Sequence, residues 1–275
     1  MRKRIPDAPP HDRITRSFVL AIVTVLIATV ASAAQPSNVG NLGNPSIAPP
    51  ESRFRGLSYS EWSAAWFQWA YSLPVTAHPL FDTADCSAGQ TGNVWFIDGT
   101  HGTPFPEDGR QCTIPPGTAL FLPLAATYSD NEGCAGLTIQ RSNLSESQLR
   151  QSAHDNLNGF LGTRGLVIDG VAVQGFPECD PAIPATCESP YRVQSPVYDY
   201  TVPAVDNILA LFDDGPCYNS PPRPDTPYTA RGAVADGVYV LIKPLSVGEH
   251  TIKFGPIDPD TGEPTREYFI TVTPR

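Results

Sequence analysis

The chain has 275 residues, and its 18 Lys and Arg against 28 Asp and Glu give a formal net charge of −10. A body this acidic repels phosphate backbones and anionic lipid surfaces, so we expect no nucleic-acid partner. The alternative is that the charge only keeps the protein in solution. Apolar residues make up 41% of the chain, with 22 Gly and 30 Pro, which indicates a folded protein rich in turns.

The first 33 residues have the three-part order of a secretory signal peptide. Five basic residues precede an apolar run over 18–30, and Ala31-Ser32-Ala33 follows as a small-residue cleavage site. A membrane-spanning helix needs ~20 residues, so we expect cleavage after residue 33, with an uncleaved signal anchor as the alternative. We therefore expect a protein that is secreted, periplasmic or at the cell surface, without stable membrane insertion after cleavage.

The chain that follows the predicted signal peptide divides into a tail and a domain. Residues 34–52 are rich in Pro, Asn, Gly and Ser, and we expect a flexible N-terminal tail there. Residues 53–275 are enough for one domain with a sizeable core.

Two segments have the pattern of amphipathic helices, over about residues 59–73 and 146–161. In each, apolar residues recur every three or four positions until a Pro or Gly ends the pattern. Each also begins with the spacing of a capping box, formed by Ser58 with Glu61 and by Ser145 with Gln148.

Most of the remaining chain is predicted to form short strands. Runs of β-branched, aromatic or alternating apolar residues occur at 93–97, 118–122, 166–168, 171–173, 191–202, 238–242, 251–254 and 268–272. Asp169-Gly170 and Asp236-Gly237 have the composition of two-residue turns. Because only two helices appear, and they do not alternate with strands, we predict a mainly β fold. The expected architecture is an antiparallel β-sandwich of jelly-roll type with two accessory helices.

Six cysteines follow the predicted signal peptide, and they allow 15 pairings. Proximity along the chain favours Cys86 with Cys112 and Cys179 with Cys187, which leaves Cys134 with Cys217. The alternative of metal or redox chemistry has less support, because no two cysteines are two residues apart and no histidine lies near them.

Aromatic residues of the first helix are the leading candidates for ligand binding. Trp62, Trp66 and Trp69 could form a platform on which sugar rings stack. A stripe of this kind is, however, more often the helix face that packs on a sheet. His101, between two glycines on an expected loop, is the histidine most available to solvent and is a further candidate.

Calcium is the one cofactor considered. Asp258, Asp260 and Glu263 place carboxylates around Gly262 in partial agreement with calcium-binding loops, although Pro259 weakens the match. The same residue types are ordinary turn formers. The prediction is therefore no cofactor, with calcium at these three carboxylates as the alternative.

Catalytic motifs are missing from the sequence. No Gly-x-Ser-x-Gly elbow and no His-Glu-x-x-His helix occurs, which argues against an enzyme. The question stays open, because triads and carboxylate pairs assemble from residues that are distant in sequence.

Six sequence patterns occur together over most of residues 56–254. They are Ser60-Glu61-Trp62-Ser63-Ala64 with Trp66 and Trp69; Gly89-Gln90-Thr91-Gly92 before Val94-Trp95-Phe96; Cys112 before Pro115, Gly117 and Ala119-Leu120-Phe121; Tyr191-Arg192-Val193 with Ser195-Pro196; Asp236-Gly237 through Val240-Leu241 and Pro244-Leu245; and Gly248-Glu249-His250-Thr251-Ile252. Together they resemble an uncharacterised family of exported bacterial proteins. The resemblance implies bacterial origin and export. No activity is established for that family, so no catalytic residue is transferred, and segment 177–190 is an addition to the pattern.

Three functions are compatible with these features. The first is a non-enzymatic, exported β-sandwich that binds extracellular carbohydrate of a surface or matrix polymer, which the aromatic residues and the missing motifs favour. The second is a secreted hydrolase that acts on glycans or esters. The third is a structural protein of the cell envelope.

Overall fold

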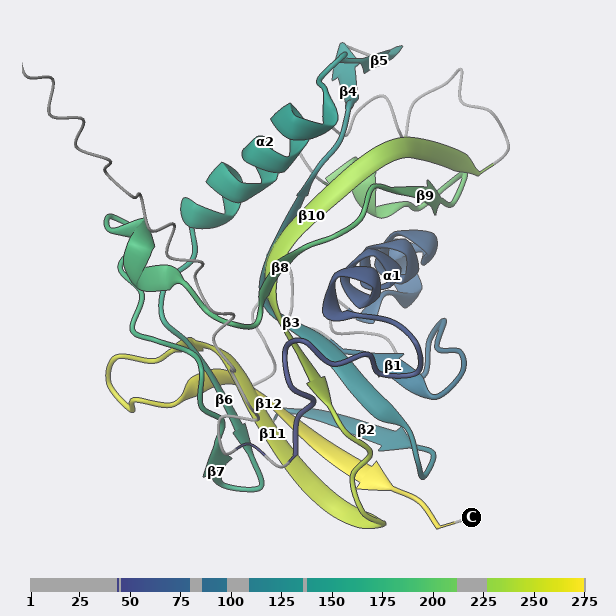
Figure 1. Ribbon diagram of the computed structural model, residues 1–275. Helices are drawn as coiled ribbons and strands as arrows, with labels where there is room; N and C mark the ends of the chain where they lie inside the picture. Colours follow the sequence, from purple (N-terminus) through teal and green to yellow (C-terminus); the bar gives the residue numbers. More distant parts are fainter. Residues whose placement is uncertain are drawn as a thin grey trace, which may run out of the picture. The chain divides into compact units, whose positions relative to one another are not determined.

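A computed structural model describes residue 44 and residues 46–79, 86–97, 109–135, 138–211 and 227–274. In this part of the chain, two five-stranded sheets pack together as an open sandwich, accompanied by two α-helices (Figure 1). The predicted mainly β sandwich with two accessory helices is therefore confirmed. The predicted signal peptide, His101 and Cys217 lie outside the described residues.

Both predicted helices are present, α1 over Tyr59–Ser72 and α2 over Glu146–Asn158. Each begins with its predicted capping box, in which the N-cap serine and the side chain three residues later exchange hydrogen bonds with each other's backbone N–H. Leu73 leaves the helical conformation just before Pro74, which ends α1. The described residues also contain short 3-10 helices: η1 (Val75–Ala77), η3 (Pro184–Cys187) and η4 (Ile208–Leu211).

The first sheet has the strand order β1-β3-β10-β8, and β9 also pairs with β10. Its strands are β1 (Val94–Phe96), β3 (Ala119–Ser129), β8 (Arg192–Gln194), β9 (Tyr198–Val202) and β10 (Tyr228–Ile242). The central strand β10 is buried at every residue over 233–242, because other elements cover both of its faces. Leu149 and Ala153 of α2 cluster with Val234 on one side, and Figure 1 shows α1 on the other side of β10.

The second sheet has the order β2-β12-β11-β6-β7. Its strands are β2 (Arg110–Ile114), β6 (Arg164–Ile168), β7 (Val171–Ala172), β11 (Gly248–Ile257) and β12 (Pro264–Val272). The predicted terminal hairpin is β11 with β12, and Asp169-Gly170 forms the two-residue turn between β6 and β7 with both φ angles positive. A separate two-stranded sheet pairs β4 (Glu132–Ala135) with β5 (Thr138–Arg141).

Each five-stranded sheet also contains one parallel pair, so the sheets are mixed rather than purely antiparallel. In the first sheet β1 runs parallel to β3, and in the second β2 runs parallel to β12. In both cases the parallel strand lies at the edge of its sheet. Strand periodicity predicts that a segment is extended but carries no information on the direction of its partner, so this feature was not predictable.

The prediction of a turn at Asp236-Gly237 is wrong, because both residues lie inside β10 and pair with β3 and β8. Asp236 is buried, and its carboxylate accepts hydrogen bonds from the Arg192 guanidinium. A Cβ on Gly237 would lie 2.6 Å from the Tyr239 ring and 2.8 Å from the Ala125 carbonyl oxygen. The Asp-Gly pair therefore provides a buried ion pair and room for an aromatic ring, not a chain reversal.

The last residues of the segment 34–52, predicted to be a flexible tail, instead pack against the domain. Ile47 is fully buried and forms a bridge with Ile242, and the Ala48 N–H donates to the Leu241 carbonyl. Asn44 exchanges two hydrogen bonds with the backbone of Gln174. Apolar side chains and backbone pairing thus attach this segment to β10, although its composition resembles that of a linker.

Disulfides join Cys86 to Cys112 and Cys179 to Cys187, so the two pairs favoured by proximity are confirmed. The first disulfide links the loop before β1 to β2, and so connects edge regions of the two sheets. The expected pair of Cys134 with Cys217 is not tested, because Cys217 lies outside the described residues. Disulfides of this kind are typical of oxidising compartments outside the cytosol. Among the described residues, no helix has the length and apolar character needed to cross a membrane.

Candidate functional site

The three tryptophans of α1 do not share one environment. Trp66 and Trp69 are 4% and 7% exposed, whereas Trp62 is only partly buried. Each indole N–H donates to a backbone carbonyl: Trp62 to Phe54 at 3.1 Å, Trp66 to Ile97 at 3.4 Å and Trp69 to Ala88 at 3.2 Å. Trp66 belongs to the core, so the three rings do not form one exposed platform.

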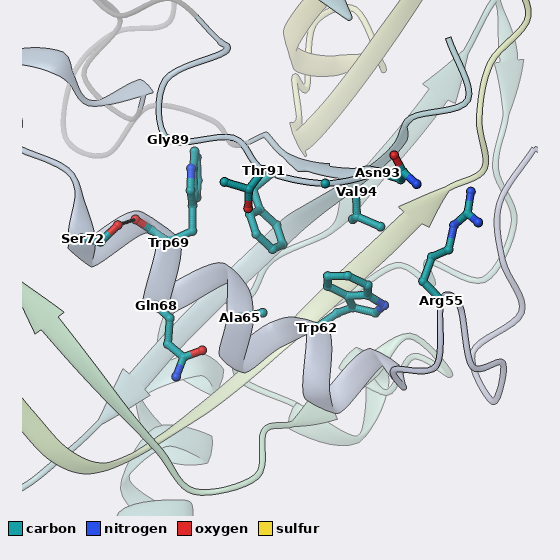
Figure 2. A pocket seen from close by; sticks show the side chains of 12 residues that line it. Arg55, Trp62, Ala65, Gln68, Trp69, Ser72, Gly89, Thr91, Asn93 and Val94 are labelled. Carbon is teal, nitrogen blue, oxygen red and sulfur yellow. Dashed lines mark hydrogen bonds between the residues drawn. The ribbon is translucent and has the colours of Figure 1, made fainter. Parts of the chain in front are cut away.

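Trp62 and Trp69 instead line a pocket of about 560 Å³ between α1 and the loop before β1 (Figure 2). Five lining residues come from α1: Trp62, Ala65, Gln68, Trp69 and Ser72. The opposite wall is formed by Gly89, Thr91, Gly92 and Asn93 of the loop together with Val94 and Phe96 of β1. Figure 2 shows Arg55 at one end of the pocket and Ser72 at the other.

Aromatic rings form a continuous apolar surface in this pocket. The centroid of the Phe96 ring lies 6.1 Å from that of Trp62 and 5.4 Å from that of Trp69. Trp62 also contacts Phe121 of β3, at 6.4 Å between ring centroids. The rings are therefore held by the core behind them, and each has little freedom to move when a ligand arrives.

The loop wall is held in place by one side chain and one disulfide. The Gln90 amide donates to the carbonyls of Cys86 and Phe96, and its carbonyl oxygen accepts from the Phe96 N–H at 2.9 Å. Cys86 is in turn bonded to Cys112 of β2. Gly89 has φ +63°, and a Cβ there would lie 2.5 Å from Leu73 and 3.2 Å from the Trp69 indole nitrogen. The close approach of loop and helix thus depends on glycine.

Neutral polar groups at the rim are available to a ligand. The side chains of Thr91 and Asn93 make no hydrogen bond to any residue that the structure describes. Gln68 donates its amide to the Asp199 carbonyl at 2.9 Å, and no donor among the described residues reaches its side-chain carbonyl oxygen. Among the described lining residues there is no carboxylate, histidine or cysteine, so the pocket offers apolar contact and hydrogen bonding rather than acid–base chemistry.

Two of the three carboxylates considered for calcium, those of Asp258 and Glu263, have partners in or beside the β11–β12 turn. One Asp258 oxygen accepts from the N–H groups of Asp260 and Thr261, and Glu263 forms an ion pair with Lys253. Within the described ranges no three His, Cys, Asp or Glu side chains come together as metal ligands. Asp258, Asp260 and Glu263 are therefore not brought together as a metal site.

Asp169, Ser246 and His250 form a chain of contacts that the sequence does not predict. His250 Nδ1 lies 2.7 Å from an Asp169 carboxylate oxygen, and His250 Nε2 lies 2.9 Å from the Ser246 carbonyl and 3.3 Å from the Ser246 hydroxyl. Asp169 and His250 also line a smaller pocket of about 220 Å³. The order of groups is that of a nucleophilic triad.

The protonation of His250 argues against that chemistry. Both ring nitrogens face acceptors, which the doubly protonated ring satisfies best. Partial burial by itself lowers the pKa of His250, but the hydrogen bonds to Asp169 and to the Ser246 carbonyl outweigh it, so the net pKa is raised. A ring that donates from Nε2 cannot accept the Ser246 proton, so this group fastens the β6–β7 turn to β11.

No family model, no curated protein and no solved structure matches this chain.

Proposed function

We propose that this chain is an exported, non-enzymatic protein that binds carbohydrate of a surface or matrix polymer in the pocket beside α1. The supporting observation is the aromatic surface of Trp62, Phe96 and Trp69 together with the rim side chains of Thr91 and Asn93, which make no hydrogen bond to a described residue. The C–H faces of a sugar ring are apolar and suit aromatic rings, while its hydroxyls need neutral hydrogen-bonding partners at the edge. The pocket volume of about 560 Å³ also lies within the range of small-molecule sites, about 300–1,000 Å³.

Binding is favoured over hydrolysis because of the groups that line this pocket. Glycoside hydrolysis uses two carboxylates that flank the scissile bond, roughly 5–9.5 Å apart. Among the described residues, the pocket wall holds none. Ester hydrolysis needs an activated nucleophile, and the hydrogen bonds of His250 leave Ser246 without a general base.

The pocket is also organised before any ligand binds. Gln90, the Cys86–Cys112 disulfide and the packing of Gly89 against Trp69 fix the loop relative to α1. A binding site whose walls are already fixed loses less conformational entropy on association.

The test is a glycan array followed by titration calorimetry with the native protein and with Trp62→Ala. We expect selective retention of particular polysaccharides and a loss of affinity of about fivefold in Trp62→Ala, since an aromatic contact contributes on the order of 1 kcal/mol. Phe160→Ala is the matched control, because Phe160 is 49% exposed and lies outside the pocket. Thermal unfolding of both variants separates lost binding from lost structure.

Two outcomes distinguish the competing functions. Release of product from a chromogenic panel of esters and glycosides identifies a hydrolase. A protein that binds no glycan on the array, releases no product from the panel and co-sediments with envelope fractions is a structural protein. That result refutes carbohydrate binding.

We further propose that the chain belongs to the family of exported bacterial proteins that it resembles. Two of the segments that carry the resemblance, over 60–69 and 89–96, supply most of the pocket wall. Expression in a bacterium with intact-mass analysis of the exported product tests the export. A mature protein that begins at Ala34 supports the proposal, whereas retention of the full chain in the cytosol contradicts it.

A further inference from the structure

Arg55 is the one charged side chain among the described residues that line the pocket. In Figure 2 it stands at the end of the pocket where Trp62 and Asn93 lie, opposite Ser72. An isolated cation in an otherwise neutral pocket needs an explanation, particularly in a chain of formal charge −10.

The backbone at Arg55 is strained. Phe54 and Leu57 exchange two backbone hydrogen bonds, at 2.9 and 3.1 Å, around a two-residue turn. The central residues Arg55 and Gly56 have φ +53° and +89°, which is the geometry that favours Asn-Gly. A long side chain in the left-handed region carries a steric penalty, and such outliers occur preferentially at functional sites.

No described residue neutralises the charge of Arg55. Its guanidinium lies 5.5 Å from the centre of the Phe54 ring and, among the described residues, forms no ion pair and no hydrogen bond. Arg53, two residues earlier, behaves differently: it pairs with Glu61 at 3.3 Å and donates to the Gly56 carbonyl. The ring contact positions the Arg55 guanidinium while its N–H groups stay available.

We propose that Arg55 receives the carboxylate of an acidic sugar, so that the polymer recognised by this pocket contains uronate. This inference rests on the proposed carbohydrate-binding function. The planar guanidinium offers two parallel N–H groups that match the two oxygens of a carboxylate. Densely sulfated polymers are disfavoured, because a strongly negative protein repels a ligand more as the ligand's charge rises.

The experiment compares oligogalacturonate with its methyl ester, which keeps the sugar and removes the charge. We expect the native protein to bind the acidic oligomer about tenfold more tightly than the ester, with an affinity that falls between 50 and 500 mM NaCl. In Arg55→Asn the preference and the salt dependence disappear, so that the acidic oligomer binds no more tightly than the ester. Because Asn suits this turn, we expect its melting temperature to equal or exceed that of the native protein.

Arg53→Asn is the matched control, since Arg53 has a carboxylate partner and does not line the pocket. It is expected to retain the preference for the acidic oligomer. A panel with alginate and glucuronate oligomers covers the other uronates, and a sulfated oligomer covers the alternative anion.

The outcomes separate this inference from the proposed function. Binding of neutral or sulfated glycans with no preference for any uronate, or an Arg55→Asn variant with an unchanged preference, overturns the role of Arg55 but leaves carbohydrate binding intact. A native protein that binds no glycan of either kind overturns both. If Arg55→Asn has a lower melting temperature than the native protein, the claim that Arg55 strains the backbone at this turn is wrong.

Discussion

Gln90 provides the sharpest test of how the pocket is held together. Its side-chain amide makes three hydrogen bonds to the backbone, two as donor to the carbonyls of Cys86 and Phe96 and one as acceptor from the Phe96 N–H. Gln90→Ala removes all three and leaves no other side chain in their place. We therefore expect both the stability of the protein and the order of the pocket wall to fall.

The magnitude follows from the count of bonds. A net contribution of about 1 kcal/mol for each hydrogen bond gives about 3 kcal/mol. Release of the glutamine side chain from one rotamer recovers about 1 kcal/mol of that loss. A net decrease in the free energy of unfolding of about 2 kcal/mol corresponds to a melting temperature lower by roughly 4–8 °C for a domain of this size.

Urea unfolding of the oxidised protein measures the loss, and hydrogen exchange at the Phe96 amide localises it. Gln111→Ala is the matched control, because Gln111 is exposed and its side chain makes no hydrogen bond to a described residue. We expect the control to stay within about 0.5 kcal/mol of the native protein. If Gln90→Ala also stays within that limit, or if Phe96 remains equally protected from exchange, the loop is held by other contacts and the reasoning fails.

Two further predictions concern the sheets. Gly237→Ala should lower the free energy of unfolding by about 1–3 kcal/mol, because its Cβ meets a buried ring and a backbone oxygen, whereas Gly162→Ala, where a Cβ approaches only the end of the Arg164 side chain, should be close to neutral. Equal urea midpoints for the two alanine variants would contradict this account of β10. The raised pKa of His250 makes its pair with Asp169 stabilising below the unfolded pKa of about 6.5, and this contribution is lost as pH rises through the folded pKa. Asp169→Asn keeps the acceptor for the Thr251 N–H, so its stability deficit should shrink from pH 6 to pH 9, and a constant deficit argues against a charged His250.

Elements governed by neighbouring residues were predictable from the sequence. The capping boxes at Ser58 and Ser145, the turn at Asp169-Gly170 and the alternation in β11 and β12 all depend on residues within a few positions of one another. The two confirmed disulfides are likewise pairs of cysteines close in sequence.

Features that depend on residues distant in sequence were not predictable. The burial of Asp236 depends on Arg192, 44 residues earlier, and nothing in the local pattern distinguishes this Asp-Gly from a turn. In the candidate site, Trp62 and Trp69 are seven residues apart and about 20° apart around α1, whereas Trp66 is rotated by about 40–60° from them. The periodicity identified the stripe, but only the positions of β1 and its loop determine which rings reach the pocket.

The parallel edge strands constrain the order in which this protein can fold. The partner of β2 is β12, which follows it by more than 150 residues, and Arg110 of β2 lies opposite Tyr268. During synthesis the described partner of β2 is therefore missing until almost the whole domain has been made. The second sheet cannot be completed before its late strand β12 is available.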